Sequence, residues 1–133
     1  MATQRDIQPK VLGELESAVM RALWERGEGT VQDVQRALQP ERDSAYTTLM
    51  TVMSRLTGKG LLVRRKEGRA YVYAPAIERE SVATSMLSSL VEKVFDGSST
   101  RAIAHLLESD EEVDDAELDR LEELIRARRQ SKQ

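Results

Sequence analysis

Residues Ser44–Gly60 read S-A-Y-T-T-L-M-T-V-M-S-R-L-T-G-K-G and predict an α-helix with two unlike faces. At a period of 3.6 residues one stripe is apolar and should be buried. The opposite face carries hydroxyls where a solvated helix usually has Glu and Lys, although Thr and Ser are poor helix formers. The apolar stripe consists of Ala45, Leu49, Val52, Met53 and Leu56, and the outer face of Thr47, Met50, Thr51, Ser54 and Gly58, with Thr48 and Arg55 on its flank.

The chemistry of this outer face is the first indication of function. Short hydroxyls let a helix lie close to another surface and can donate or accept hydrogen bonds, and the methyl group of Thr matches the C5 methyl of thymine. We therefore expect a recognition helix in the major groove of DNA. The alternative interpretation is a surface helix that happens to be rich in Thr.

The preceding segment predicts two further helices. The first should end at Gly27, which has the position of a C-terminal cap. Thr30 and Asp33 have the spacing of a capping box at the start of the second, which Gln39-Pro40 would end. This order of elements is that of a helix-turn-helix. The apolar positions are Leu12, Leu15, Ala18, Val19, Ala22 and Leu23 in the first helix, and Val31, Val34, Ala37 and Leu38 in the second.

A β-hairpin is predicted directly after the recognition helix. The run L-L-V-R-R-K-E-G-R-A-Y-V-Y-A contains two β-prone segments separated by a turn near Glu67-Gly68. Three helices and a basic hairpin make a winged helix, whose wing lies along phosphates while the third helix contacts bases. Basic residues that only protect an exposed sheet edge are the alternative. The candidate DNA-binding residues are Tyr46, Thr47, Thr48, Met50, Thr51, Ser54, Arg55, Lys59, Arg64, Arg65, Lys66 and Arg69.

Charge is distributed unevenly along the 133 residues, whose net charge is -3. Met1–Ala74 holds 12 basic and 9 acidic side chains, whereas Pro75–Gln133 holds 8 and 14. Within Ser44–Ala74, six cations accompany a single carboxylate, that of Glu67. Local charge steers association, so the basic segment favours a nucleic-acid partner and the acidic half indicates a second task.

Several functional classes are excluded or disfavoured. The chain has no Cys, so disulfides, thiolate metal sites and Cys nucleophiles are excluded. No apolar run approaches the roughly 18 residues of a membrane span and the N-terminus lacks a signal-peptide pattern, so we expect a cytoplasmic protein without membrane insertion. A Gly-rich phosphate loop, a nucleophile-His pair and a metal cluster are all lacking, so we expect neither an enzyme nor a cofactor.

The acidic run Glu108–Glu123, with ten carboxylates, does not match an EF-hand loop. We interpret it as a solvated face that repels DNA. His105, the only histidine, is interpreted as a packing or surface residue rather than a metal ligand.

The second half predicts three amphipathic helices, at about 78–95, 100–108 and 115–129. About 55 residues in three helices give little core of their own, so their apolar stripes should pack on a second copy of the chain. The alternative is a monomer in which they fold back onto the winged domain. The candidate dimerisation residues are Val82, Met86, Leu87, Leu90, Val94, Ile103, Leu106, Leu107, Leu118, Leu121 and Ile125.

Two blocks of sequence resemble the penicillinase-repressor (BlaI/MecI) family. The first is L-x-x-L-E-x-x-V-M-x-x-L-W, from Leu12 to Trp24, and the second is A-Y-T-T-L-M-T-V-M-S-R-L-x-x-K-G-L, with the hairpin end R-A-Y-V-Y-A-P. The resemblance implies a winged-helix repressor that binds a pseudo-palindromic operator on double-stranded DNA as a homodimer held by its C-terminal helices.

The resemblance also bears on regulation. Some members are cut at an Asn-Phe bond by a membrane sensor protease, and the corresponding positions here are His105-Leu106, which departs from that pattern. Another branch binds copper or zinc through clustered cysteines, a mode that the absence of Cys excludes.

The predicted fold class is therefore mainly α with a small β-hairpin. A flexible arm at residues 1–10 precedes a winged helix-turn-helix domain at 11–75 and a C-terminal helical dimerisation region at 76–133. A winged-helix protein-interaction module that binds no operator is the alternative function. Binding to the DNA upstream of the chain's own gene distinguishes the two.

Overall fold

The computed structural model describes residues 12–132, so the predicted arm at residues 1–10 lies outside the described residues. The chain divides into two compact units, one extending to Ser89 and the other beginning at Leu90. We call them the winged unit and the C-terminal unit. In chain order the elements are α2 (Glu14–Arg26), α3 (Val31–Leu38), α4 (Tyr46–Gly58), β1 (Leu62–Glu67), β2 (Ala70–Pro75), α5 (Arg79–Val94), α6 (Ser99–Ser109) and α7 (Asp115–Ser131).

The predicted helix ends form in the winged unit for the expected reasons. Gly27 follows α2 with φ of 98°, a conformation that side chains disfavour, and its N–H donates to the Leu23 carbonyl. At the start of α3 the Thr30 hydroxyl accepts from the Asp33 N–H, and the Asp33 carboxylate accepts from the Thr30 N–H at 2.9 Å. This reciprocal pair satisfies two amide groups that the helix itself leaves without partners.

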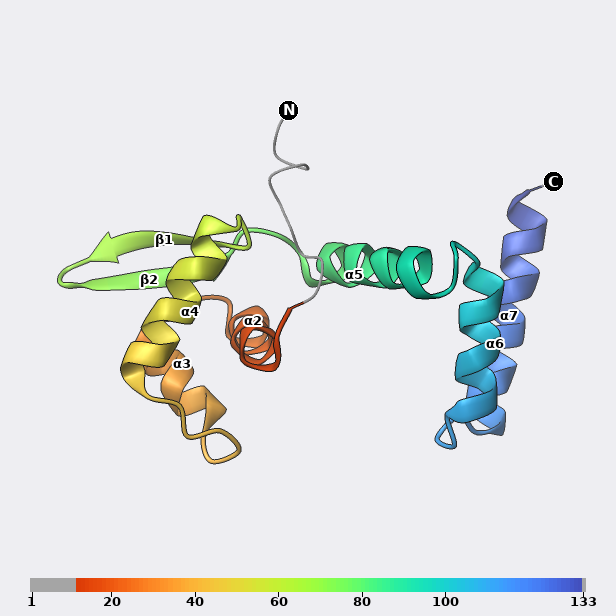
Figure 1. Cartoon of the computed structure of the whole chain (residues 1–133), viewed down its shortest axis with the longest axis horizontal. Helices are drawn as coiled ribbons and strands as arrows, with labels where there is room; N and C mark the ends of the chain where they lie inside the picture. Colours follow the sequence, from red (N-terminus) through yellow and green to blue (C-terminus); the bar gives the residue numbers. More distant parts are fainter. Residues whose placement is uncertain (1–11, 133) are drawn as a thin grey trace. The chain divides into compact units, whose positions relative to one another are not determined.

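The wing is a β-hairpin tied to the turn between α2 and α3. β1 and β2 pair antiparallel with Glu67 opposite Ala70, which leaves Gly68 and Arg69 in the turn, and Gly68 has φ of 64°. Gly29 and Tyr73 exchange two backbone hydrogen bonds of 2.9 and 2.8 Å, so a short bridge extends the sheet beyond β2. Figure 1 shows α4 in yellow beside the green hairpin.

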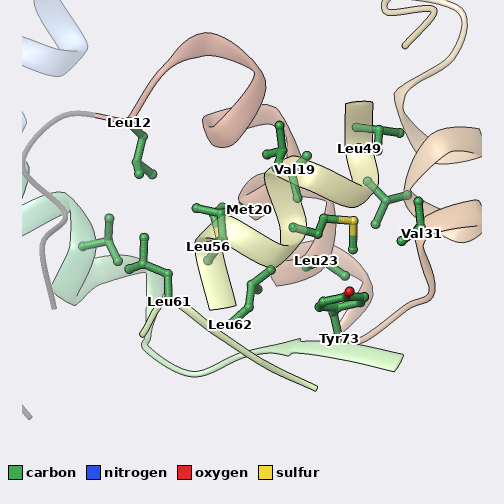
Figure 2. Packing of buried hydrophobic residues seen from close by; sticks show 14 residues of the cluster. Leu12, Val19, Met20, Leu23, Val31, Leu49, Leu56, Leu61, Leu62 and Tyr73 are labelled. Atoms are coloured by element: carbon green, nitrogen blue, oxygen red, sulfur yellow. The ribbon is translucent and has the colours of Figure 1, made fainter. Parts of the chain in front are cut away.

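A single hydrophobic core holds the winged unit together. The fully buried side chains come from α2, α3, α4, β1 and β2 and from the link Gly60-Leu61, and Figure 2 shows how they interlock around Met20 and Leu56. Burying one such Leu or Met contributes about 2 kcal/mol, so these contacts fix the face of α4 that is left to solvent. The principal core residues are Leu12, Val19, Met20, Leu23, Val31, Val34, Leu49, Val52, Met53, Leu56, Leu61, Leu62 and Tyr73.

Two residues of the apolar stripes predicted for the three helices of the winged unit are exposed. Ala45 is exposed because it precedes the helix as its N-cap, with extended backbone, rather than lying within the stripe. Ala37 is also exposed, on the side of α3 that borders an open groove against α2. Both positions fit the helical period in the sequence, but neither side chain is buried in the structure.

The winged unit extends beyond the predicted boundary at residue 75. Val82 of α5 is 2% exposed and belongs to the core, and Met86 packs against it half-buried. The indole Nε1 of Trp24 donates to the Ile77 carbonyl at 3.0 Å, and this bond joins α2 to the segment leading into α5. The division between the compact units therefore lies inside α5, between Ser89 and Leu90.

The C-terminal unit is held by local contacts. After α5, Asp96 and Gly97 adopt positive φ in the turn that leads into α6, and Arg101 bonds Asp96 at 3.2 Å. Ser98 caps α6 through the Arg101 N–H, and Asp114 caps α7 through the Glu117 N–H. No residue of α7 is buried.

Candidate nucleic-acid interface

The outer face of α4 is open to solvent along its length. Each of its predicted DNA-binding residues is exposed, including Tyr46 at 48% and Met50 at 46%. The Thr51 hydroxyl donates to the Thr47 carbonyl at 3.0 Å, so its proton is used within the helix while its methyl group and acceptor lone pairs are not. The exposed residues of this face and its flank are Tyr46, Thr47, Thr48, Met50, Thr51, Ser54 and Arg55.

An open cleft of about 500 Å³ lies between α4 and the wing. It brings together hydroxyl groups from the recognition helix and a cation from β1, which the sequence places in separate elements. The lining residues are Met50, Thr51, Ser54, Arg55, Arg64, Tyr71 and Tyr73. This cleft combines hydrogen-bonding groups, positive charge and aromatic surface, which is the chemistry that nucleic acids contact.

Arg64 is held inside this cleft by two tyrosines. Its guanidinium carbon lies 4.2 Å from the centroid of the Tyr71 ring, and its Nη1 donates to the Tyr73 hydroxyl at 3.4 Å. The hydrogen bond to Tyr73 raises the pKa of Arg64, which is charged at every relevant pH. Tyr73 is buried, whereas Tyr71 is 41% exposed, so the cation rests on a half-open aromatic surface.

Arg65 has a different environment. Its Nη1 and Nη2 donate to the two carboxylate oxygens of Glu28 at 2.9 and 3.0 Å, and its Nε and Nη2 donate to Glu67 at 3.0 and 2.7 Å. These bonds raise the pKa of Arg65 and lower that of Glu28. Successive strand residues point to opposite faces, so Arg65 lies on the face of β1 away from Arg64.

The remaining predicted cations also divide into two groups. Lys59 is bonded to Glu16 at 3.1 Å and is half-buried, so it connects the end of α4 to α2. Burial acts to raise the pKa of Glu16, but hydrogen bonds from the Gly13 N–H and from Lys59 lower it overall. Within residues 12–132, Lys66 and Arg69 are exposed and form no ion pair with a carboxylate.

Sequence reasoning missed the partners of these cations. The spacing of Tyr71 and Tyr73 gave a signal, because they alternate on β2 opposite Lys66 and Arg64. Glu28 gave none, since it lies 37 residues from Arg65 and meets it only once the hairpin bridges to Gly29.

Most of the predicted dimerisation residues expose apolar surface. The exceptions are Val82, whose assignment is corrected because the core of the same chain covers it, and Met86 and Leu121, which are half-buried. The exposed residues are Leu87, Leu90, Val94, Ile103, Leu106, Leu107, Leu118 and Ile125, between 41% and 60% accessible.

The His105-Leu106 bond lies in the middle of α6. The His105 ring packs against Phe95 with centroids 5.8 Å apart, and its carbonyl accepts from the Ser109 hydroxyl. In the part of the chain that the structure describes, no group of three or more His, Asp or Glu side chains is placed to hold a metal ion. None of the helices described is long and apolar enough to cross a membrane.

A helix-turn-helix whose exposed third helix shares a cleft with a basic hairpin defines a winged-helix DNA-binding protein. Residues 12–127 match the family model described as penicillinase repressor. The chain belongs to the penicillinase-repressor family, and it is a DNA-binding transcriptional repressor rather than an enzyme.

The chain is similar to individual proteins that bear these names. The transcriptional regulator BlaI of Mycobacterium tuberculosis is 46% identical over 99 residues, which cover 73% of this chain and 72% of the relative. The penicillinase repressor of Bacillus licheniformis is 26% identical over 75% of this chain and 78% of its own length. Among solved structures, the DNA binding domain of the repressor BlaI is similar with a TM-score of 0.49 and 29% identity, covering 55% of this chain and 89% of that one.

Proposed function

We propose that the protein represses transcription as a homodimer bound to a pseudo-palindromic operator, with α4 of each subunit in the major groove and the wing on the phosphates. The observation that carries this proposal is the cleft where the exposed hydroxyl face of α4 meets Arg64 of β1. A helix enters the major groove of B-DNA, and neutral hydroxyls and methyl groups can contact base edges there at little desolvation cost.

Exposed apolar surface in the C-terminal unit supports the dimer. Ile103, Leu106 and Leu107 on α6 and Leu118, Leu124 and Ile125 on α7 are each at least 41% exposed. Apolar side chains exposed in this number cost free energy in water, and exposed apolar surface is typical of protein interfaces. Two linked DNA-binding units would occupy two half-sites, and the operator symmetry would match that of the dimer.

Regulation by proteolysis is the further part of the proposal. A cut between Phe95 and Asp114 would separate α5 from α7 and lower operator affinity by weakening the dimer. A membrane sensor protease is the candidate partner. Because the His105-Leu106 bond is inside a helix, a protease would reach it only after α6 unfolds locally.

Affinity measured against salt tests the proposed division of labour. We expect neutral substitutions in α4 to change which base pairs are preferred. They should leave the salt slope, which is the slope of log affinity against log salt concentration, unchanged because hydroxyls release no condensed counterions. These substitutions are Thr47→Ala, Thr51→Ala and Ser54→Ala. Lys66→Gln and Arg69→Gln should weaken binding to operator and scrambled duplexes alike, with a slope smaller by about one for each phosphate that the wing no longer neutralises.

The duplexes are the DNA upstream of the chain's own gene and a scrambled version of equal length, each measured by fluorescence anisotropy of labelled DNA. A protein that binds neither duplex at low salt would favour the protein-interaction module. Wing variants that lose sequence preference at constant slope would show that the two elements have been assigned the wrong way round.

A further inference from the structure

The two adjacent arginines of β1 have opposite surroundings, although they are the same residue type at consecutive positions. Arg64 lies in the cleft that α4 borders and rests on Tyr71, with no carboxylate bonded to it within residues 12–132. Arg65 lies on the other face and has all three guanidinium nitrogens bonded to Glu28 or Glu67.

The charge around Arg65 makes it a poor ligand for phosphate. One cation and two carboxylates give that cluster a net charge of -1, and a phosphate would have to displace bidentate carboxylate contacts that are already short. Charge-assisted bonds of this geometry are among the stronger ones in proteins, so the exchange would bring little gain.

The position of Glu28 gives Arg65 a different task. Glu28 directly precedes Gly29, whose backbone pairs with Tyr73 of β2, and Arg65 comes from β1 on the far side of β2. The ion pair therefore spans the sheet from its outer strand to the turn after α2. It adds a side-chain link between the hairpin and the turn after α2, next to the backbone bridge between Gly29 and Tyr73.

The Arg64 side chain is pre-organised for binding an anionic group. Stacking on Tyr71 and the bond to Tyr73 restrict a side chain that otherwise loses much rotational freedom on binding. Its charge remains uncompensated, and it faces the same cleft as Thr51, Ser54 and Arg55.

We propose that Arg64, held by Tyr71 and Tyr73, is the arginine through which the wing contacts the DNA backbone beside α4, whereas Arg65 is a positioning residue that fixes the wing to the turn after α2. This inference deepens the proposed function and rests on it. It also removes Arg65 from the phosphate contacts expected from the sequence.

The test compares three variants of the full-length protein, including Tyr71→Leu, with one control for charge. Arg64→Gln removes the proposed contact. The double variant Glu28→Gln with Arg65→Gln removes the link while leaving the net charge of the Arg65 cluster at -1, so a change in the long-range field does not confuse the result. Arg21→Gln on the exposed surface of α2, outside the cleft, is the control for the loss of one positive charge.

Arg64→Gln should reduce the salt slope by about 0.9 per subunit relative to Arg21→Gln. The double variant should bind DNA several-fold more weakly, because a loosely attached wing must become ordered when it binds. Its salt slope should equal that of the unmodified protein, because no phosphate contact is lost and the same number of counterions is released. Tyr71→Leu should weaken binding to all duplexes at an unchanged slope.

Equal slopes for Arg64→Gln and Arg21→Gln would overturn the assignment of Arg64. A reduced slope in the double variant would overturn that of Arg65. Circular dichroism and thermal denaturation verify that each variant is folded. If the unmodified protein shows no salt-dependent binding to any duplex, the proposed function itself fails, which is a different result from either of these.

Discussion

At the scale of single residues, Asp33 shows how a short polar side chain defines a helix end. Its carboxylate accepts from the Thr30 N–H, and this backbone hydrogen bond is the main reason that the pKa of Asp33 is lowered. Arg26 lies 3.4 Å away and adds to the effect. The capping box was visible in the sequence because both partners are within three residues.

Replacing Asp33 by Ala should destabilise the winged unit by about 1 kcal/mol at pH 7, since the Thr30 amide loses its partner. A group whose pKa is lowered by folding stabilises above its unfolded pKa, about 4 for Asp, and the effect disappears as the pH falls through the folded value. The loss should therefore shrink in acid. Thermal denaturation at several pH values measures it, with the exposed Gln32→Ala on the same helix as control. A pH-independent difference would contradict this account.

Val82 and Leu87 show what residue type alone does not reveal. Both are apolar residues on α5 and both were predicted to face a second copy, yet Val82 is 2% exposed and Leu87 is 56% exposed. Helical periodicity identifies which apolar side chains should be buried. It does not show whether the residues that bury them belong to the same chain or to a second copy.

The two residues should respond differently to truncation. Val82→Ala should lower the stability of the winged unit by about 2 kcal/mol, through lost burial and the cavity left behind. Leu87→Ala should change it by less than about 0.5 kcal/mol. Hydrogen exchange of the α2 and α4 amides reports this unit by itself. Similar losses in both variants would show that the burial of Val82 has no special role.

At the scale of elements, local sequence predicted the helices closely. The observed α5, α6 and α7 begin and end within about two residues of the predicted limits, because caps and breakers such as Asp114 and Gly97 act over three or four residues. The outer face of α4 was also predicted, since its apolar stripe determines the opposite side. The pairing of Arg65 with Glu28 was not, because it depends on a long-range bridge between strand and turn.

The helical state of α6 leads to a prediction about proteolysis. Proteases bind extended chain, so within the C-terminal unit a glutamyl endopeptidase should cut first after Glu111 or Glu112, which lie between α6 and α7. Glu117, Glu122 and Glu123 in α7 should be cut later. Mass spectrometry of early fragments identifies the order. Early cleavage throughout α7 would show that this helix is unfolded in solution.

At the scale of the whole molecule, the apolar surface of the C-terminal unit determines the assembly that we propose. The α6 residues Ile103 and Leu106 are each more than half exposed. Changing both to Asp should convert a dimer at micromolar concentration into a monomer, because desolvating two charges in an apolar interface is unfavourable. Operator affinity should fall on the order of a hundredfold as the second half-site loses its tether.

Sedimentation equilibrium and operator binding of the full chain measure both effects. Thr100→Asp, an exposed polar position on the same helix, is the matched control and should leave the dimer intact. Full-length protein that sediments as a monomer before any substitution would contradict the dimer proposal.

The bond from Trp24 to the Ile77 carbonyl has a practical consequence. Trp24 is the only tryptophan in the chain, and the three tyrosines, Tyr46, Tyr71 and Tyr73, also belong to the winged unit. Intrinsic fluorescence therefore reports the winged unit alone, and the emission of Trp24 should shift to the red when the segment leading into α5 detaches and water reaches the indole. Beyond Ser89 the chain has no Trp or Tyr and contributes almost nothing to this fluorescence, so unfolding of the winged unit can be followed separately from that of the C-terminal unit without attaching a dye.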